Sequence, residues 1–115
     1  MANLKRSRIN LVTEVKEGEI ITKTFLTPPF LPMSVMYEGL DVADAVENGG
    51  LTEREKMEKM AIFTADTLYK GQFTTEELVN GLHGPEAIDI LQEQLIFSTN
   101  GYQSDETKNF LAKKN

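Results

Sequence analysis

The chain has 115 residues, no cysteine, no tryptophan, one histidine and a formal net charge of −6. Its length corresponds to one ordinary domain. The absence of cysteine excludes a disulfide scaffold, a thiolate zinc site and a cysteine nucleophile, and the single His83 excludes a multi-histidine metal site. No apolar run is long enough to span a membrane, and no signal-peptide pattern follows the basic start, so we expect a protein that stays in the cytoplasm.

Charge is distributed unevenly along the chain. Residues 1–8 and residues 108–115 each carry +3, whereas the segment between them carries −12. An acidic body repels phosphate backbones, so we expect no nucleic-acid partner. Either the basic ends contact the acidic middle of a second copy, or they are solvated tails.

The N-terminal part of the sequence predicts an antiparallel β-hairpin over residues 8–26. Apolar residues alternate with polar ones in the first half, except at Val12 and Thr13, and β-branched and aromatic residues continue in the second half. Glu17-Gly18 is a plausible turn between the two strands. A hairpin alone is marginally stable in water, so this one must pack on the rest of the chain or pair with another copy.

A proline-rich strap over residues 27–33 follows the hairpin and leads into helices over residues 34–98. The first helix is predicted over residues 34–47, with Ser34 as its N-cap and a glycine pair after its end. Its inward-facing residues are expected to be Met36, Leu40, Ala43 and Val46.

Three further helices are predicted from their start and stop signals. Capping boxes at Thr52-x-x-Glu55 and Thr74-x-x-Glu77 begin helices over residues 53–70 and 75–82. Gly84-Pro85 begins the fourth helix, which ends at Asn100-Gly101. The sequence therefore predicts a mainly α fold with a minor β part: a four-helix compact domain preceded by a β-hairpin, forming a single domain over residues 1–100, with a weakly ordered tail over residues 101–115.

No arrangement of residues typical of catalysis or of a cofactor site is present. No serine lies in a nucleophile elbow, and Gly49-Gly50 lacks the following residues of a phosphate loop. Acid pairs such as Glu76-Glu77 lie in helix first turns, where they favour the helix dipole. No calcium-loop pattern surrounds the acids of the first helix. We therefore expect no catalytic residues, no metal and no cofactor, and hence a protein that is not an enzyme.

The remaining candidates are apolar residues that can bind a partner. Methionine is unbranched and polarisable, so a methionine-rich helix face adapts to varied apolar helices, although core packing explains such residues equally well. The helices also carry more apolar surface than four short helices and a hairpin are expected to cover. The candidate partner-binding residues are Met33, Met36, Met57, Met60, Phe73, Phe110 and Leu111.

The stretch from Phe63 to Gly81, FTADTLYKGQFTTEELVNG, together with the proline-rich entry FLTPPFLPMSV, resembles tail assembly chaperones of siphophages and prophages of Gram-positive bacteria. The resemblance covers about residues 24–98. It implies a mostly helical protein without enzymatic activity that binds the tape measure protein and keeps it soluble while the tail assembles. It also implies self-association, a place in the host bacterial cytoplasm, and absence from the mature virion.

Two other functions remain open at this point. A small structural virion component, such as a connector or tail subunit, would use the hairpin to pair subunit edges. An acidic inhibitor that imitates the charge of DNA would use the −12 segment, although its acids are dispersed among helix starts.

Overall fold

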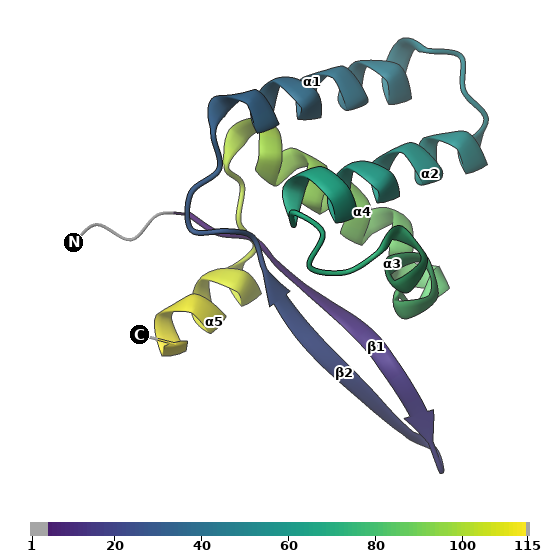
Figure 1. Ribbon diagram of the computed structural model, residues 1–115, viewed down its shortest axis with the longest axis vertical. Coiled ribbons are helices and arrows are strands. Elements are labelled where there is room, and N and C mark those ends of the chain that lie inside the picture. Colours follow the sequence, from purple (N-terminus) through teal and green to yellow (C-terminus); the bar gives the residue numbers. More distant parts are fainter. Residues whose placement is uncertain (1–4, 115) are drawn as a thin grey trace.

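The computed structural model describes residues 5–114, and Figure 1 shows their arrangement. The order of elements confirms the expected mainly α fold with an N-terminal antiparallel hairpin. The elements are β1 (Arg8–Lys16), β2 (Glu19–Leu26), α1 (Met33–Asn48), α2 (Glu53–Ile62), the π-helix η1 (Phe63–Leu68), α3 (Thr75–Gly81), α4 (Gly84–Asn100) and α5 (Asp105–Lys114).

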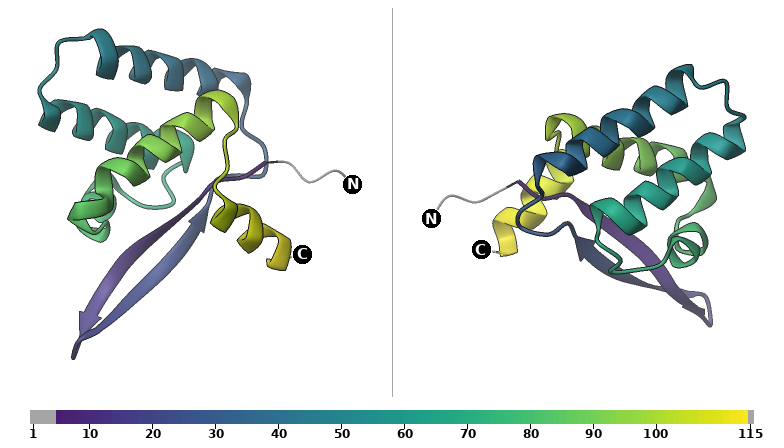
Figure 2. Two further views of the ribbon diagram at one scale, coloured as in Figure 1. Left: turned by 180° about the vertical axis from the view of Figure 1, so that it is seen from behind. Right: turned by 45° about the horizontal axis from the view of Figure 1, so that its top comes forward.

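The hairpin is an arm that projects from the helices. Glu17 and Gly18 both have positive φ (50° and 82°), which is the backbone of the tight turn expected there. Thr13 is an extra residue in β1, and the resulting bulge explains why the alternation breaks at this point. Ile9 and Leu11 near the base are buried, whereas every residue from Thr13 to Thr24 is exposed. Figures 1 and 2 show that the turn end of the hairpin extends beyond the helices.

The helices pack around one apolar core. α1 and α2 run side by side with α4 across them, and α3 packs against β1 (Figures 1 and 2). Both predicted capping boxes are confirmed, at Thr52 and at Thr74. The prediction of Ser34 as an N-cap is wrong, because α1 begins one residue earlier, at Met33, with Pro32 as an N-cap that makes no side-chain bond.

The helix predicted over residues 53–70 changes its winding halfway. After α2, the backbone widens into η1, where the N–H of Tyr69 donates to the carbonyl of Thr64, five residues earlier, at 3.0 Å. A widened turn rotates the side chains that follow it. Leu68 and Tyr69 are neighbours in sequence, and both are fully buried in this arrangement.

Gln94 of α4 attaches the base of the hairpin to the helices through a buried polar network. Its Oε1 accepts hydrogen bonds from the hydroxyls of Ser7 (2.9 Å) and Tyr69 (2.6 Å). Its Nε2 donates to the backbone carbonyl of Arg8 at 3.0 Å. Burial raises the pKa of the Tyr69 hydroxyl, so this group remains a protonated donor within the network.

The segment after Gly101, expected to be weakly ordered, includes helix α5. This helix lies beside the base of the hairpin (Figures 1 and 2). The guanidinium of Arg8 lies 5.1 Å from the centre of the Phe110 ring and 3.7 Å from a carboxylate oxygen of the exposed Glu106. Gln103, just before α5, donates to the carbonyl of Arg6 at 2.7 Å.

Candidate functional site

An apolar stripe of exposed side chains runs along the outer face of α1. Met33 is 58% exposed, Tyr37 56% and Leu40 48%. Their spacing of four and three residues places them on one helix face. Phe30, which precedes the helix, is also exposed. We call Phe30, Met33, Tyr37 and Leu40 the α1 stripe.

The opposite face of α1 explains why this stripe points outward. Val35 and Gly39 are buried on that face. A Cβ added at Gly39 would lie 3.2 Å from Cγ2 of Thr99, so the glycine permits a close approach between α1 and α4. Because α1 packs through Val35 and Gly39, Leu40 turns away from the core. The expectation that Leu40 faces inward is therefore wrong.

The surroundings of the stripe are acidic. α1 carries four acidic residues and no basic residue, and Glu38, Asp41, Asp44 and Glu47 are all exposed. An apolar helix that binds here would therefore be favoured if basic residues flank its apolar face.

The structure places the seven candidate partner-binding residues in different environments. Met33 is exposed, and Met36, Met57, Phe110 and Leu111 are half-buried. Met60 and Phe73 lie in the core, where the Phe73 ring packs against Phe25 with ring centres 4.8 Å apart. The structure does not bring the seven together as one surface. Of these seven residues, only Met33 belongs to the α1 stripe.

The sequence analysis did not select three residues of this stripe: Phe30, Tyr37 and Leu40. Within α1, Met33, Tyr37 and Leu40 repeat at spacings of four and three residues, as in a helix-binding seam, and this was the available signal. Core-facing apolar residues repeat in the same way, so the spacing could not show which face of α1 is exposed.

A hollow lies between β1, the start of α4 and α5. It has a volume of about 470 Å³, and its lining includes Arg8, His83 and carboxylates from both helices: Glu86, Asp89, Glu93 and Glu106. Within residues 5–114, no group of three or more histidine, cysteine or acidic residues is arranged to hold a metal ion. No helix within that range is long and apolar enough to cross a lipid bilayer.

The structure is that of a small, mainly helical protein with a projecting hairpin and an exposed apolar stripe on α1. The sequence matches the family described as phage tail chaperone protein over residues 6–115, and the chain belongs to that family. Comparison with curated proteins and with solved structures finds no match. Members of a chaperone family assist assembly, and such families are in general not enzymes.

Proposed function

We propose that this protein binds the tape measure protein of its phage and keeps that long apolar chain soluble while the tail assembles. The α1 stripe carries this proposal, because it exposes apolar side chains at the spacing that matches one face of a partner helix. Met33 and Tyr37 suit varied partners, since methionine is flexible and tyrosine combines an apolar ring with a polar end.

We also propose how the protein acts, where it works and that its copies associate. The protein acts by binding alone, without catalysis, cofactor or metal. It works in the host bacterial cytoplasm, self-associates, and is absent from the mature virion. Membership of a chaperone family supports these points, and the acidic body supports solubility of a protein that exposes apolar surface.

Co-expression with the tape measure protein tests the proposal. We expect the wild-type chain to increase the soluble fraction of the tape measure protein and to co-purify with it. Leu40→Asp places a charge within the α1 stripe and should reduce both. The matched control is Val79→Asp on α3, because Val79 is an apolar residue outside the stripe that is 59% exposed, against 48% for Leu40. Equal solubility with and without the chain, or equal loss in both variants, would contradict the proposal.

Mass spectrometry of purified virions separates this role from that of a structural tail component. A chaperone should be missing from the particles, whereas a connector or tail subunit should be present in many copies. The exposed hairpin makes this comparison necessary, because an exposed strand edge also suits permanent subunit pairing.

A further inference from the structure

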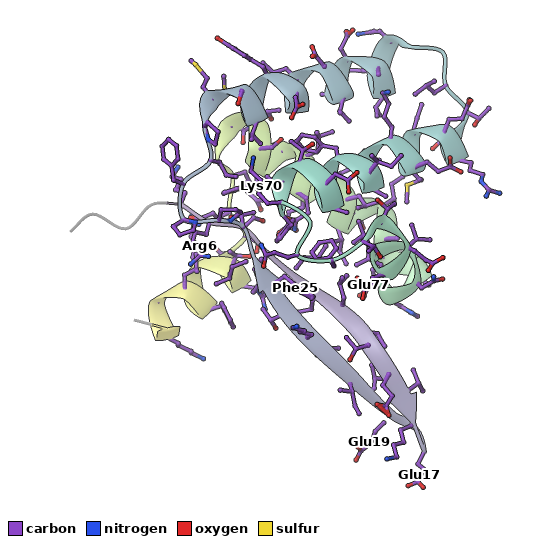
Figure 3. The ribbon with its side chains drawn as sticks, viewed as in Figure 1. Arg6, Glu17, Glu19, Phe25, Lys70 and Glu77 are labelled. Atoms are coloured by element: carbon purple, nitrogen blue, oxygen red, sulfur yellow. The ribbon has the colours of Figure 1, made fainter. Side chains whose placement is uncertain are left out.

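We infer that the outer edge of β2 pairs with the same edge of a second copy, so that two hairpins form one antiparallel four-stranded sheet. The inference specifies the surface for the self-association included in the proposed function, and it rests on that part alone. The relevant segment is the projecting end of the hairpin, where all residues from Glu19 to Thr24 are exposed. Figure 3 shows Glu17 and Glu19 at the free end, away from the helices.

The backbone of β2 leaves this edge unpaired. The Ile21 carbonyl accepts a hydrogen bond from the Thr13 hydroxyl of β1 at 3.3 Å and therefore faces β1. The Leu26 carbonyl faces the other way, because it accepts from Nε2 of Gln72 at 2.8 Å. Backbone groups alternate along a strand. The outward groups are therefore those of Ile20, Thr22 and Thr24, and within residues 5–114 they have no hydrogen-bond partner.

The corresponding edge of β1 is closed. The Arg8 carbonyl already accepts from Gln94. Further along, α3 lies so close that a Cβ added at Gly81 would be 3.1 Å from the carbonyl oxygen of Val12. The bulge at Thr13 interrupts the rest of the strand. An added strand therefore fits β2 and not β1.

Charge selects a second copy as the partner and fixes the register. Glu19 and Lys23 lie on one face of β2 and form no ion pair within residues 5–114. If two β2 strands pair antiparallel with Ile21 opposite Ile21, each Glu19 faces Lys23 of the second copy. Opposite charges in directly facing positions stabilise a sheet. Shifting the strands by two residues sets a charge opposite Ile21 instead and loses both ion pairs.

The remaining side chains fit the same register. Lys16 already faces Glu19 within the hairpin, so a ladder of alternating charge would run from Lys16 through Glu19 to Lys23 of the second copy. On the other face, the exposed pair Val15 and Ile20 would meet Thr22 of the second copy. This second row consists of β-branched side chains, which pack well across strands.

The pairing also leaves room for both bodies. In this register Gly18 of the second copy lies opposite Thr24, just before Gln72 closes the edge at Leu26. The helices of each copy therefore lie at opposite ends of the shared sheet. The arrangement has a two-fold axis at Ile21 and closes after two copies.

Cysteine cross-linking tests the register directly, because the natural chain has no cysteine. In Ile21→Cys the two introduced residues face each other in a pair without mutual hydrogen bonds, with Cα atoms about 4.5 Å apart, which permits a disulfide. We expect Ile21→Cys to form a covalent dimer under mild oxidation. The matched control is Val15→Cys. Val15 is 69% exposed and Ile21 40%, but the two copies of Val15 would be at least about 14 Å apart, because three strand spacings separate them.

Charge exchange provides an independent test by light scattering over a concentration series. Lys23→Glu places two like-charge pairs in the interface and should raise the dimer dissociation constant at least about tenfold. Adding Glu19→Lys should restore much of the affinity. Lys59→Glu on α2 changes the net charge equally and should leave the dissociation constant unchanged.

Each result supports or overturns the inference. If dimers persist unchanged in Lys23→Glu, or if Val15→Cys cross-links as well as Ile21→Cys, the copies associate through another surface. The proposed chaperone role is then unaffected. A wild-type chain that stays monomeric at all concentrations would overturn both the inference and the proposed self-association. Loss of tape measure solubilisation with dimerisation intact would instead contradict the chaperone proposal.

Discussion

Among single residues, Gln94 joins elements that are far apart in the sequence. It accepts from Ser7 and Tyr69 and donates to Arg8, and it is almost completely buried. Gln94→Leu would leave three polar groups without a partner. Each buried unsatisfied group costs about 1–3 kcal/mol, so we expect the free energy of unfolding to fall by about 3 kcal/mol.

Urea denaturation followed by circular dichroism measures this loss. The control is Gln92→Leu, an exposed glutamine on the same helix, which should change stability by less than about 0.5 kcal/mol. Equal stability of the Gln94→Leu and Gln92→Leu variants would show that the network does not hold the hairpin base.

Tyr69 makes the stability of the protein depend on alkaline pH. Burial raises the pKa of its hydroxyl above the ordinary value of 10.0, so the folded state keeps a proton that the unfolded state releases. The stabilisation is complete below pH 10 and is lost as pH rises above it, at up to about 1.4 kcal/mol per pH unit.

We expect Tyr69→Phe to be less stable than the wild type at pH 7 by about 1 kcal/mol, because one buried hydrogen bond is lost. We also expect its stability to decline less between pH 10 and pH 11, as measured by urea denaturation at each pH. Identical pH profiles for the two proteins would contradict the assignment of this dependence to Tyr69.

Among the elements, α3 and β1 depend on a glycine at their contact. A Cβ at Gly81 would approach Cβ of Leu11 to 3.1 Å and the backbone of Val12 equally closely. Since the strand backbone cannot move without loosening the hairpin, Gly81→Ala should reduce the free energy of unfolding by about 1–3 kcal/mol. Thermal denaturation provides the measurement.

Gly84→Ala is the matched control for that substitution. Gly84 begins α4, has no atom within 4 Å of an added Cβ, and does not have positive φ. We expect unchanged or slightly higher stability, because alanine restricts the unfolded chain. If Gly84→Ala lowers the stability as much as Gly81→Ala does, the effect comes from the loss of glycine flexibility and not from the contact with β1.

Across the whole chain, stability should be lowest at the extremities. The accessible surface is 7539 Å², against about 6,300 Å² for a compact monomer of this mass. The hairpin end and α5 account for part of this excess, because neither is covered by the helical core. Hydrogen exchange should therefore be fastest in residues 14–23 and in α5, and slowest in η1 and the middle of α4.

Exchange measured by mass spectrometry at several protein concentrations checks this order. Protection of residues 18–24 should increase with concentration if copies pair through β2, whereas α5 should not change. Slow exchange throughout α5 would show that the contacts of Phe110 and Glu106 with Arg8 hold this helix more firmly than its many exposed residues suggest.

Local signals in the sequence predicted the boundaries of most elements. The capping boxes at Thr52 and Thr74, the turn at Glu17-Gly18 and the glycine after Asn100 each act through a few neighbouring residues, and all four are confirmed. The interruption at Val12 and Thr13 was also visible, and it corresponds to a bulge. Such features depend on local backbone geometry, which the sequence encodes directly.

The candidate site was less predictable. Met60 and Phe73 fit a partner-binding pattern as well as they fit a core, and only packing decides between these. The widening of the helix at η1 has no local signal in the sequence, and in the folded protein it accompanies the burial of both Leu68 and Tyr69. Helix α5 was missed because most of its residues are polar and its stabilising contacts come from Arg8, almost a hundred residues earlier in the chain.

The amino-acid order by itself therefore determined the hairpin, the starts of α2, α3 and α4, the end of α4, and the resemblance to tail assembly chaperones. Tertiary structure decided which face of α1 is exposed and which edge of the hairpin is open. The reason is that exposure results from contacts between distant elements: α4 takes the Gly39 side of α1, and α3 takes the edge of β1. Periodicity shows that a helix has an apolar face, but only packing shows whether that face is covered.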